Sequence, residues 1–285
     1  MNKVIILGNG YVGSNLYERL QFQEGYDVNI ERRKLLNYND IKKLERYIDE
    51  QKPDYIVNCS GFTGRPNVDE GEEKKELCFE LNTFAPLRIS NLCKLKDINY
   101  IHISSGCIYT DYTKVYTEED EPNFGLFDEE SSTYSKSKHA FELGCDWGLI
   151  LRVRMPFCDM LHERSYITKI YKYDNLIDMV NSKTYIPQLL DFIEYFISKG
   201  YEAKDKELLN FVNSEPLSTK KVTELMKQFE ITNPNWEWVH FCDLDVKANR
   251  SNCVLSSDKL LEQYGFDIWS EEVALGAALT NIICA

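Results

Sequence analysis

The chain has 285 residues, of which 43% are hydrophobic, so it is long enough to bury a full core. Its formal net charge is −13 and it contains no basic stripe, which excludes nucleic acid as an expected partner. No run of 18 apolar residues occurs and the N-terminus leads directly into a strand, so we expect a soluble cytoplasmic protein that does not contact a membrane.

The first predicted element is an apolar strand over residues 3–7, which leads into Gly8-Asn-Gly10-Tyr-Val-Gly13 and a helical pattern over 14–23. Strand, glycine turn and helix stand in the order of a dinucleotide-binding motif. Gly8 would allow the tight turn, Gly10 would let the backbone approach a pyrophosphate, and Gly13 would let helix and strand pack closely. The alternative is a plain glycine hairpin. The predicted cofactor contacts of this turn are Gly8, Asn9, Gly10, Tyr11, Val12 and Gly13.

A second predicted strand, over 27–30, runs into Glu31-Arg32-Arg33-Lys34. An acidic residue here would favour the free ribose hydroxyl of NADH, whereas arginines would accommodate the extra phosphate of NADPH. Three cations against one carboxylate favour NADPH, with Arg32 and Arg33 as its contacts. NADH and a merely solvated charged turn are the alternatives.

Alternating strand and helix signals predict an α/β fold, in which a Rossmann-type doubly wound parallel sheet is joined to a smaller C-terminal substrate-binding lobe. We expect residues 1–157 to bind NADP(H), with a return to this domain at about 187–212, and 158–285 to form mainly the lobe. The predicted helices span about 40–50, 70–95, 133–147, 187–199, 218–229 and 271–283, and the further predicted strands span 54–58, 98–104, 149–154 and 208–212.

One of these strands ends in Asn58-Cys-Ser-Gly61, and open parallel sheets bind ligands at the carboxyl ends of their strands. We therefore predict that Asn58, Ser60 and Gly61 lie beside the cofactor. Cys59 is predicted to be a small packed residue. Asn82, inside the long helix, either orders the loop at this site or satisfies a local polar contact.

Tyr134-Ser-Lys-Ser-Lys138 begins the helix that follows the strand ending in Ser104-Ser105. A Tyr and a Lys four residues apart lie on one helix face. The ammonium can depress the pKa of the phenol and hold a ribose, so that Tyr134 exchanges a proton with a carbonyl oxygen while a nicotinamide moves hydride. The same spacing occurs at 38/42 and 195/199, but only Tyr134 follows a buried strand and a complete nucleotide-binding half.

Cys107 lies just beyond the Ser104-Ser105 strand end. Reduction of a ketone has no use for a thiol, whereas moving a proton on the carbon beside the ketone needs an extra acid or base. The alternative is that Cys107 is a packed residue. The nine cysteines are scattered without CxxC or Cys/His clusters, which predicts reduced thiols and no metal site.

These motifs together resemble the extended short-chain dehydrogenase/reductases. A closer resemblance is to the bifunctional UDP-4-keto-6-deoxyglucose 3,5-epimerase/4-reductases, which make UDP-L-rhamnose in plants and some viruses. It extends from residue 1 to about 260, although the glycine turn is one residue shorter than the plant type. The segments that carry it are Gly61-Phe-Thr-Gly-Arg-Pro-Asn-Val-Asp69, Gly106-Cys-Ile-Tyr109, Glu119-Asp-Glu-Pro-Asn-Phe124, Leu151-Arg-Val-Arg-Met-Pro156 and Tyr166-Ile-Thr-Lys-Ile170.

The resemblance implies that Ser105, Tyr134 and Lys138 form a reductase triad. It further implies that Cys107 and Lys169 are the acid/base pair of an epimerase, with either group as the base. Lys169 could instead be a surface lysine. The implied substrate is a UDP-linked 4-keto-6-deoxyhexose, and family members usually form homodimers. The residues implied to contact substrate are Thr63, Arg65, Asn67, Ser104 and Arg250, the last at the diphosphate.

Two alternatives to the bifunctional enzyme stand beside it. One is a reductase alone, similar to dTDP-4-dehydrorhamnose reductase, which relies on a separate epimerase. The other is a non-catalytic relative that binds a nucleotide and regulates a partner enzyme.

Overall fold

The computed structural model describes residues 1–65, 67–243 and 246–284. Its central layer is a six-stranded sheet of order β2-β1-β3-β4-β5-β7, in which every neighbouring pair of strands is parallel. The predicted α/β fold with a parallel sheet is therefore confirmed. The strands are β1 (Asn2–Leu7), β2 (Tyr26–Glu31), β3 (Tyr55–Asn58), β4 (Asn99–Ser105), β5 (Gly148–Val153) and β7 (Lys206–Phe211).

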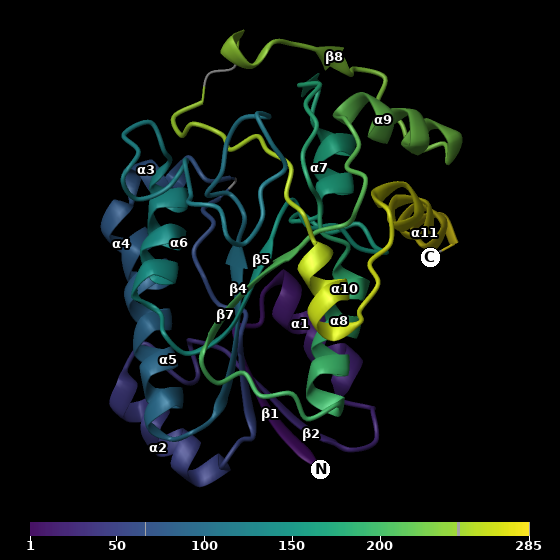
Figure 1. Cartoon of the computed structure of the whole chain (residues 1–285). Helices are drawn as coiled ribbons and strands as arrows, with labels where there is room; N and C mark the ends of the chain where they lie inside the picture. Colours follow the sequence, from purple (N-terminus) through teal and green to yellow (C-terminus); the bar gives the residue numbers. More distant parts are fainter. Residues whose placement is uncertain (66, 244–245, 285) are drawn as a thin grey trace.

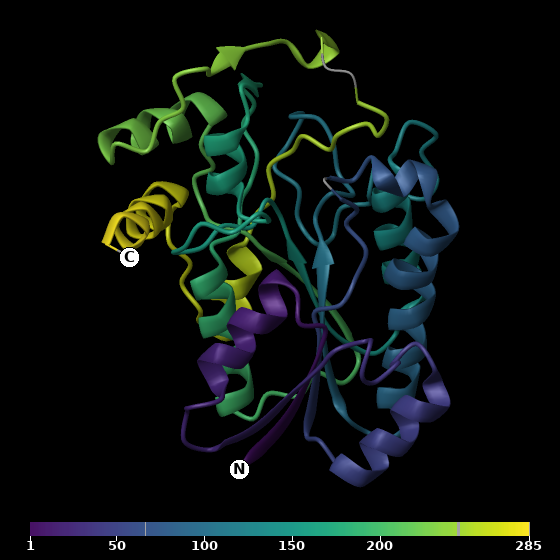
Figure 2. The same cartoon turned by 180° about the vertical axis from the view of Figure 1, so that it is seen from behind.

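Helices cover both faces of this sheet (Figure 1 and Figure 2). One apolar core lies between the sheet and α1 (Tyr11–Leu20), α8 (Ile186–Ser198) and α10 (Asp258–Tyr264). A second lies between the opposite face and α2 (Ile41–Gln51), α5 (Ala85–Leu95) and α6 (Thr133–Gly144). Because the central strands are buried on both faces, their sequences are nearly continuous apolar runs.

The single helix predicted over about 70–95 is wrong in detail. The segment is divided into α3 (Glu70–Glu73), α4 (Lys75–Phe79), a π-helical turn η1 (Glu80–Phe84) and α5. In η1 the N–H of Ala85 bonds the carbonyl of Glu80, five residues back. Pro86 has no N–H to donate to the carbonyl of Asn82, so a regular α-helical ladder could not be complete here. Wide turns of this kind are frequent at functional sites.

A further group of elements lies beyond the carboxyl ends of the strands (Figure 1). Its apolar core includes Phe157, Leu176, Tyr185, Val222 and Ala278. Sequence periodicity predicted two of its helices but not its short elements. The group consists of α7 (Tyr166–Lys172), β6 (Asn175–Leu176), α9 (Thr219–Gln228), β8 (Glu237–Trp238), the 3-10 turn η2 (Phe241–Asp243) and α11 (Glu271–Cys284).

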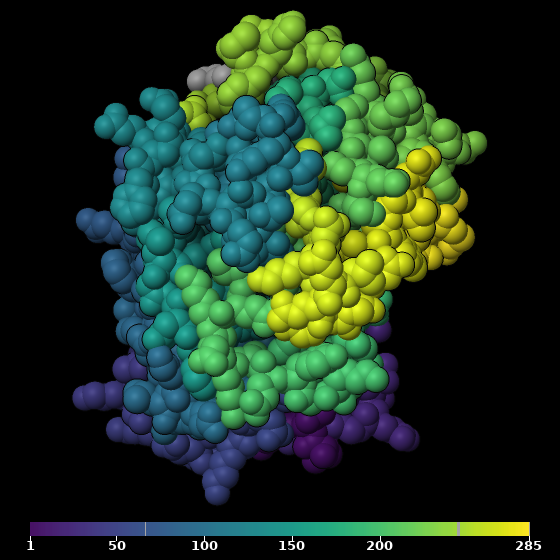
Figure 3. All heavy atoms as spheres, in the orientation of Figure 1, coloured from purple at the N-terminus to yellow at the C-terminus, as the bar shows by residue number. Residues whose placement is uncertain are grey.

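Two segments that are far apart in the sequence pair with each other at the surface. The loop after β4 pairs with the chain before α10, through Tyr116 N–H to Val254 carbonyl at 2.9 Å and Ser256 N–H to Tyr116 carbonyl at 2.8 Å. In the space-filling view these segments lie side by side on the surface (Figure 3). Among the helices formed by described residues, none has the length and apolar character needed to cross a bilayer.

Candidate active site

The turn between β1 and α1 leaves room only for glycine at two of its positions. At Gly8, with φ of +99°, an added Cβ would lie 3.0 Å from the backbone of Ser60, and at Gly13 it would lie 1.9 Å from the Gly8 carbonyl oxygen. Gly10 precedes α1 with open space around it. The first N–H groups of α1 therefore face a cradle that fits the pyrophosphate of a dinucleotide.

The end of β3 lies beside this turn, at the point where the strand order of the sheet reverses. Asn58 is fully buried, and its Oδ1 accepts hydrogen bonds from the N–H of Ser60 at 3.0 Å and the hydroxyl of Ser60 at 2.6 Å. Its side chain thus shapes the turn from beneath and is not open to a ligand. Gly61 is exposed, and a Cβ there would lie 3.6 Å from Lys138 Nζ.

Asn82 connects this loop to the helix that carries the predicted acid. It is fully buried in the π-helical turn, and its amide hydrogen-bonds both main-chain groups of Phe62. Its Nδ2 also lies 3.1 Å from the hydroxyl of Ser137 in α6. Of the two roles considered for Asn82, the ordering of the loop is therefore the one that its contacts support.

The start of α6 is fixed by buried polar contacts. Ser132 caps the helix by accepting from the N–H of Ser135, and Glu72 accepts from both the N–H and the hydroxyl of Thr133 at 2.7 Å. Lys138 follows one turn after Tyr134, is 4% exposed, and points its Nζ at the carbonyl of Ile103, 3.5 Å away. Burial lowers the pKa of Lys138 to about 8.

The groups around Tyr134 shift the pKa of its phenol in opposite directions. Burial raises the pKa of its phenol above the ordinary value and the neighbouring Cys107 adds to the rise, while hydrogen bonding to Ser105 and the charge of Arg154 lower it. The net effect keeps the phenol protonated at neutral pH. A protonated phenol beside a serine hydroxyl is the form that can donate a proton to a carbonyl oxygen.

The structure brings Cys107 and Lys169 into the same region. Cys107 is partly exposed, and its N–H donates to the hydroxyl of Ser105 at 3.2 Å. Lys169, in α7, interacts electrostatically with Cys107 across the site. Burial lowers the pKa of the Lys169 amine, and the nearby cations Arg164 and Arg250 lower it further.

Ser104 is not brought to this group. Adjacent residues of a strand point to opposite faces, so the Ser104 hydroxyl faces α6, where it donates to Glu142 Oε1 at 2.9 Å. Glu142 is also paired with Arg152 at 2.8 Å, and all three side chains are almost completely buried. Ser104 therefore serves this buried network rather than a substrate contact.

The other residues predicted to contact substrate lie in the loop after β3 and near α10. Thr63 and Arg65 are exposed, whereas the Asn67 Oδ1 accepts from the N–H of Asp69 at 2.8 Å and so stabilises the loop. Arg250 is held by Asp69, with 2.8 Å between its NH1 and the carboxylate. Arg250 thus comes from a distant segment to join this loop.

Sequence reasoning missed several contacts because their partners are distant in the chain. Arg164 donates to the Gly64 carbonyl at 2.9 Å, bridging a separation of 100 residues. The ring of Tyr11 stacks on His162, with 4.5 Å between the centroids. No local pattern marks Arg164 or His162, since both lie in an irregular loop.

At the end of β2, the residues predicted to select between NADPH and NADH differ in whether a ligand could reach them. Arg32 and Arg33 are exposed, while the carboxylate of Glu31 accepts a hydrogen bond from the Tyr47 hydroxyl. The described residues contain no group of three or more His, Cys, Asp or Glu arranged to hold a metal.

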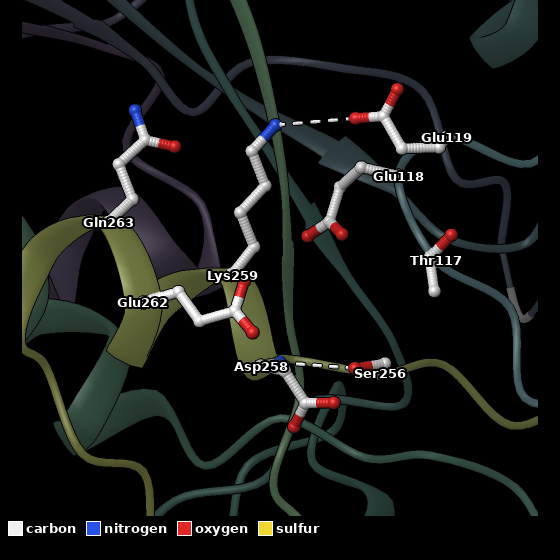
Figure 4. A pocket seen from close by; sticks show the side chains of 8 residues that line it. All are labelled: Thr117, Glu118, Glu119, Ser256, Asp258, Lys259, Glu262 and Gln263. Carbon is white, nitrogen blue, oxygen red and sulfur yellow. Dashed lines mark hydrogen bonds and ion pairs between the residues drawn. The ribbon is translucent and has the colours of Figure 1, made fainter.

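A surface hollow of about 480 Å³ is a different feature (Figure 4). It lies between α10 and the acidic segment after Tyr116, where the only ion pair drawn joins Lys259 to Glu119 at 3.9 Å. Within this segment Glu118 accepts from the N–H of Asn210 at 2.6 Å, and burial raises the pKa of its carboxyl. None of the predicted site residues lines this hollow.

Comparison with known proteins supplies the family. Residues 1–282 match the family described as RmlD substrate binding domain. A bifunctional dTDP-4-dehydrorhamnose 3,5-epimerase/dTDP-4-dehydrorhamnose reductase of Arabidopsis thaliana is 30% identical over 241 residues, which cover 79% of this chain and 76% of that protein. A trifunctional UDP-glucose 4,6-dehydratase/UDP-4-keto-6-deoxy-D-glucose 3,5-epimerase/UDP-4-keto-L-rhamnose-reductase of the same plant is 30% identical over 228 residues, 75% of this chain, but the match spans only 32% of that longer protein.

Two solved structures extend the comparison. The L780 UDP-rhamnose synthase of Acanthamoeba polyphaga mimivirus has a TM-score of 0.87 at 27% identity, covering 98% of this chain and 99% of that one. A dTDP-4-dehydrorhamnose reductase of Bacillus anthracis, in complex with NADP, has a TM-score of 0.83 at 20% identity and shares the fold, with coverages of 96% and 98%.

The parallel sheet, with its glycine turn at the point where the strand order reverses, defines a nucleotide-binding α/β protein of the Rossmann type. Within this class, the chain belongs to the RmlD substrate binding domain family.

Proposed function

We propose that the protein is an NADPH-dependent reductase of a nucleotide-linked 4-keto-6-deoxyhexose of the 4-keto-rhamnose type. The observation that carries this proposal is the grouping of Ser105, Tyr134 and Lys138, with Lys138 beside Gly61 in the loop that packs against the glycine turn. The family relationship supports it, because the similar plant protein is named as a reductase of such a sugar.

In this reaction the bound cofactor supplies hydride to C4 of the sugar. Tyr134 donates its phenol proton to the C4 oxygen, so that the ketone becomes an alcohol and the phenol becomes a phenolate, which then regains a proton from water. Ser105 donates a hydrogen bond to the same oxygen and orients it. Lys138, as an ammonium, holds the ribose and stabilises the phenolate.

The preference for NADPH over NADH is part of the proposal. Exposed Arg32 and Arg33 are free to bind a ribose phosphate. Glu31, which would repel that phosphate and favour a ribose hydroxyl, is engaged by Tyr47.

A second candidate activity, 3,5-epimerisation at the same site, is favoured by the electrostatic interaction between Cys107 and Lys169. The 4-keto group acidifies the hydrogens at C3 and C5, so a base on one face and an acid on the other invert each centre through an enolate. Tyr134 and Ser105 would stabilise the enolate oxygen. Reduction alone accounts for the family relationship, whereas epimerisation rests on this pair.

The same proposal assigns the nucleotide sugar to the lobe formed mainly by residues 158–285, and the cofactor to residues 1–157. It includes a homodimer, supported by exposed apolar side chains on the outer helices around α6. These side chains are Leu77, Phe84, Leu95 and Leu143.

The test is incubation with UDP-4-keto-6-deoxyglucose and NADPH in deuterated water, followed by NMR of the product. Deuterium at C3 and C5 together with the L-rhamno configuration supports both activities. Consumption of NADPH only when the sugar is already epimerised supports reduction alone. Failure to oxidise NADPH with any 4-keto sugar nucleotide, UDP- or dTDP-linked, contradicts the proposal and favours a non-catalytic nucleotide-binding protein.

Matched variants separate the two activities. Tyr134→Phe removes the proton donor and is expected to abolish reduction. Cys107→Ser is expected to block deuterium uptake while reduction of a pre-epimerised sugar continues. Full deuterium uptake by Cys107→Ser contradicts the epimerase assignment.

A further inference from the structure

Arg154, the residue after β5, is the feature that the proposed reaction leaves unexplained. Its side chain is 1% exposed and its guanidinium is held between segments that are far apart in the chain. NH1 donates to the Gly106 carbonyl at 3.0 Å and to the hydroxyl of Ser251 at 2.7 Å. NH2 donates to Asn181 Oδ1 at 2.7 Å and to the Ser251 carbonyl at 3.2 Å, while Nε is buried with no partner among the described residues.

The charge of Arg154 has no carboxylate to balance it in the described part of the chain. Among the other buried cations of the described residues, Arg152 pairs with Glu142 at 2.8 Å and Lys183 pairs with Glu271 at 2.6 Å, whereas Lys138 has no ion pair and already has a role in the proposed reaction. A buried charge without a counter-ion is costly, so its presence calls for a role.

The hydrogen bond to Gly106 connects Arg154 with the proton donor. The amide whose oxygen accepts from Arg154 is the amide whose N–H, that of Cys107, donates to the Ser105 hydroxyl at 3.2 Å. Ser105 in turn hydrogen-bonds Tyr134. A cation at one end of such a chain polarises each following bond in the same direction.

The side chain of Arg154 also packs tightly against Gly106. A Cβ at Gly106 would lie 3.1 Å from Arg154 Cγ and 2.4 Å from Leu255, so the stem of the arginine packs directly against the segment 105–107. The guanidinium therefore fixes the position of this segment as well as its polarity.

The titratable groups near Arg154 are the thiols Cys107 and Cys253, the phenols Tyr112 and Tyr134, and the cation Lys183. Arg154 lowers the pKa of Tyr134, against burial, Cys107 and Cys78, which raise it. Tyr134, which Arg154 favours as an anion, is the group assigned to proton transfer in the reduction.

We propose that Arg154 is a positioning residue of the active site, which holds the segment 105–107 and supplies a fixed positive charge to it through the amide between Gly106 and Cys107. This inference rests on the proposed roles of Ser105 and Tyr134. This role explains why an arginine without a carboxylate partner is buried at this position, which packing alone does not explain.

The test compares Arg154→Gln, which removes the charge, with Arg154→Lys, which keeps it. In the oxidation direction Tyr134 acts as the base, so the rate rises with pH as the phenolate forms. Arg154→Gln is expected to move the pH of half-maximal rate upward by about one unit and to lower the maximal rate about tenfold or more. Arg154→Lys is expected to leave that pH unmoved. The ionisation of Lys138 is common to all variants, because Arg154 is not among the charges that act on it.

Thr184→Val is the matched structural control. Thr184 accepts from the backbone N–H of Arg154 at 3.0 Å and donates to the Phe211 carbonyl, so its loss loosens the same region without a change of charge. It is expected to lower the melting temperature without moving the pH of half-maximal rate. If Arg154→Gln behaves in the same way, Arg154 has only a structural role and the inference is wrong.

A second measurement needs no turnover. The rate at which iodoacetamide alkylates Cys107 at pH 8, followed by peptide mass spectrometry, is expected to fall severalfold in Arg154→Gln and to be retained in Arg154→Lys, because the positive charge of Arg154 acts on this sulfur. Equal rates in all three proteins would contradict the inference.

If the wild type reduces no keto sugar, the proposed function fails, and the alkylation rates still decide the role of Arg154. If Arg154→Gln does not fold, the comparison of Arg154→Lys with Thr184→Val remains: loss of the normal alkylation rate in Arg154→Lys alone would show that the charge is not what matters.

Discussion

The amide of Asn82 holds Phe62 by both of its main-chain groups: Oδ1 accepts from the N–H at 2.7 Å and Nδ2 donates to the carbonyl at 2.9 Å. The pair spans 20 residues and joins the π-helical turn to the loop after β3. Because the loop contains Gly61, which lies beside Lys138, this contact orders the wall against which a cofactor would lie.

Asn82→Ala is expected to weaken NADPH binding about tenfold, because it leaves two main-chain groups of Phe62 unpaired at a cost of about 1–3 kcal/mol. The measurement is quenching of protein fluorescence by NADPH. Asn91→Ala, at an exposed position of α5, is the control and should bind normally. An unchanged dissociation constant for Asn82→Ala would show that the loop does not need this contact.

The rate of reduction is expected to fall as pH rises through about 8. Burial lowers the pKa of Lys138 to about 8, so the ammonium that would hold the ribose and stabilise the Tyr134 phenolate is lost above that pH. The measurement is the initial rate of NADPH oxidation between pH 6 and 10. A rate that stays constant up to pH 10 would argue against a role for the charged lysine.

Lys138→Met is expected to raise the melting temperature at pH 7 while abolishing reduction. The folded-state pKa of Lys138 lies below its unfolded value, so the unfolded chain binds the extra proton between about pH 8 and 10.5, and stability increases with pH over that window. At pH 7 the buried ammonium costs about 3 kcal/mol, which methionine removes. Lys136→Met, on the same helix, is the control. A lower melting temperature for Lys138→Met than for this control would contradict the expectation.

The fully buried pair Lys183–Glu271 ties α11 to the rest of the molecule, with 2.6 Å between Nζ and Oε1. Glu271→Gln is expected to destabilise the protein by about 3–5 kcal/mol, because it leaves a buried cation unpaired. Lys183→Met combined with Glu271→Leu should recover most of that loss. Urea unfolding of the single and double variants measures the coupling, and purely additive losses would mean that the two side chains do not interact.

Cofactor preference is expected to depend on Tyr47. Tyr47→Phe frees the carboxylate of Glu31, which is then available to a ribose hydroxyl and repels a ribose phosphate. The ratio of NADPH to NADH affinity should fall about fivefold, equivalent to about 1 kcal/mol. Adding Glu31→Gln to this variant should restore the preference, whereas an unchanged ratio in both variants would place the determinant elsewhere.

Much of the fold was predictable because its signals are local. The central strands of the sheet are buried on both faces and were visible as apolar runs, and the glycine turn marked the first crossover. The short elements α7, α10, β6 and β8 were missed, since two to seven residues are too few to show a period. The π-helical turn was missed because hydrophobic spacing does not reveal which carbonyl an N–H will reach.

The candidate site likewise contains some residues that local patterns predict and others that they do not. The spacing of Tyr134 and Lys138 needs only the helical period, so it could be predicted. The opposite orientations of Ser104 and Ser105 follow from strand alternation. Which of the two serines belongs to the site could be decided only from the packing of α6, because Ser104 bonds to Glu142 and Ser105 bonds to Tyr134. Arg154 lies in one of the segments that carry the resemblance, but no local pattern indicated its role, because its partners lie 27 to 97 residues away.

By itself, therefore, the sequence determined the local frames: strand, glycine turn and helix at the N-terminus, and one helix face that carries tyrosine and lysine. Only the tertiary structure decided the partners of the buried polar groups, such as Phe62 for Asn82 and the Gly106 carbonyl for Arg154. The physical reason is that backbone periodicity is set by neighbours along the chain, whereas a buried donor or acceptor must be satisfied by whatever segment the fold brings to it.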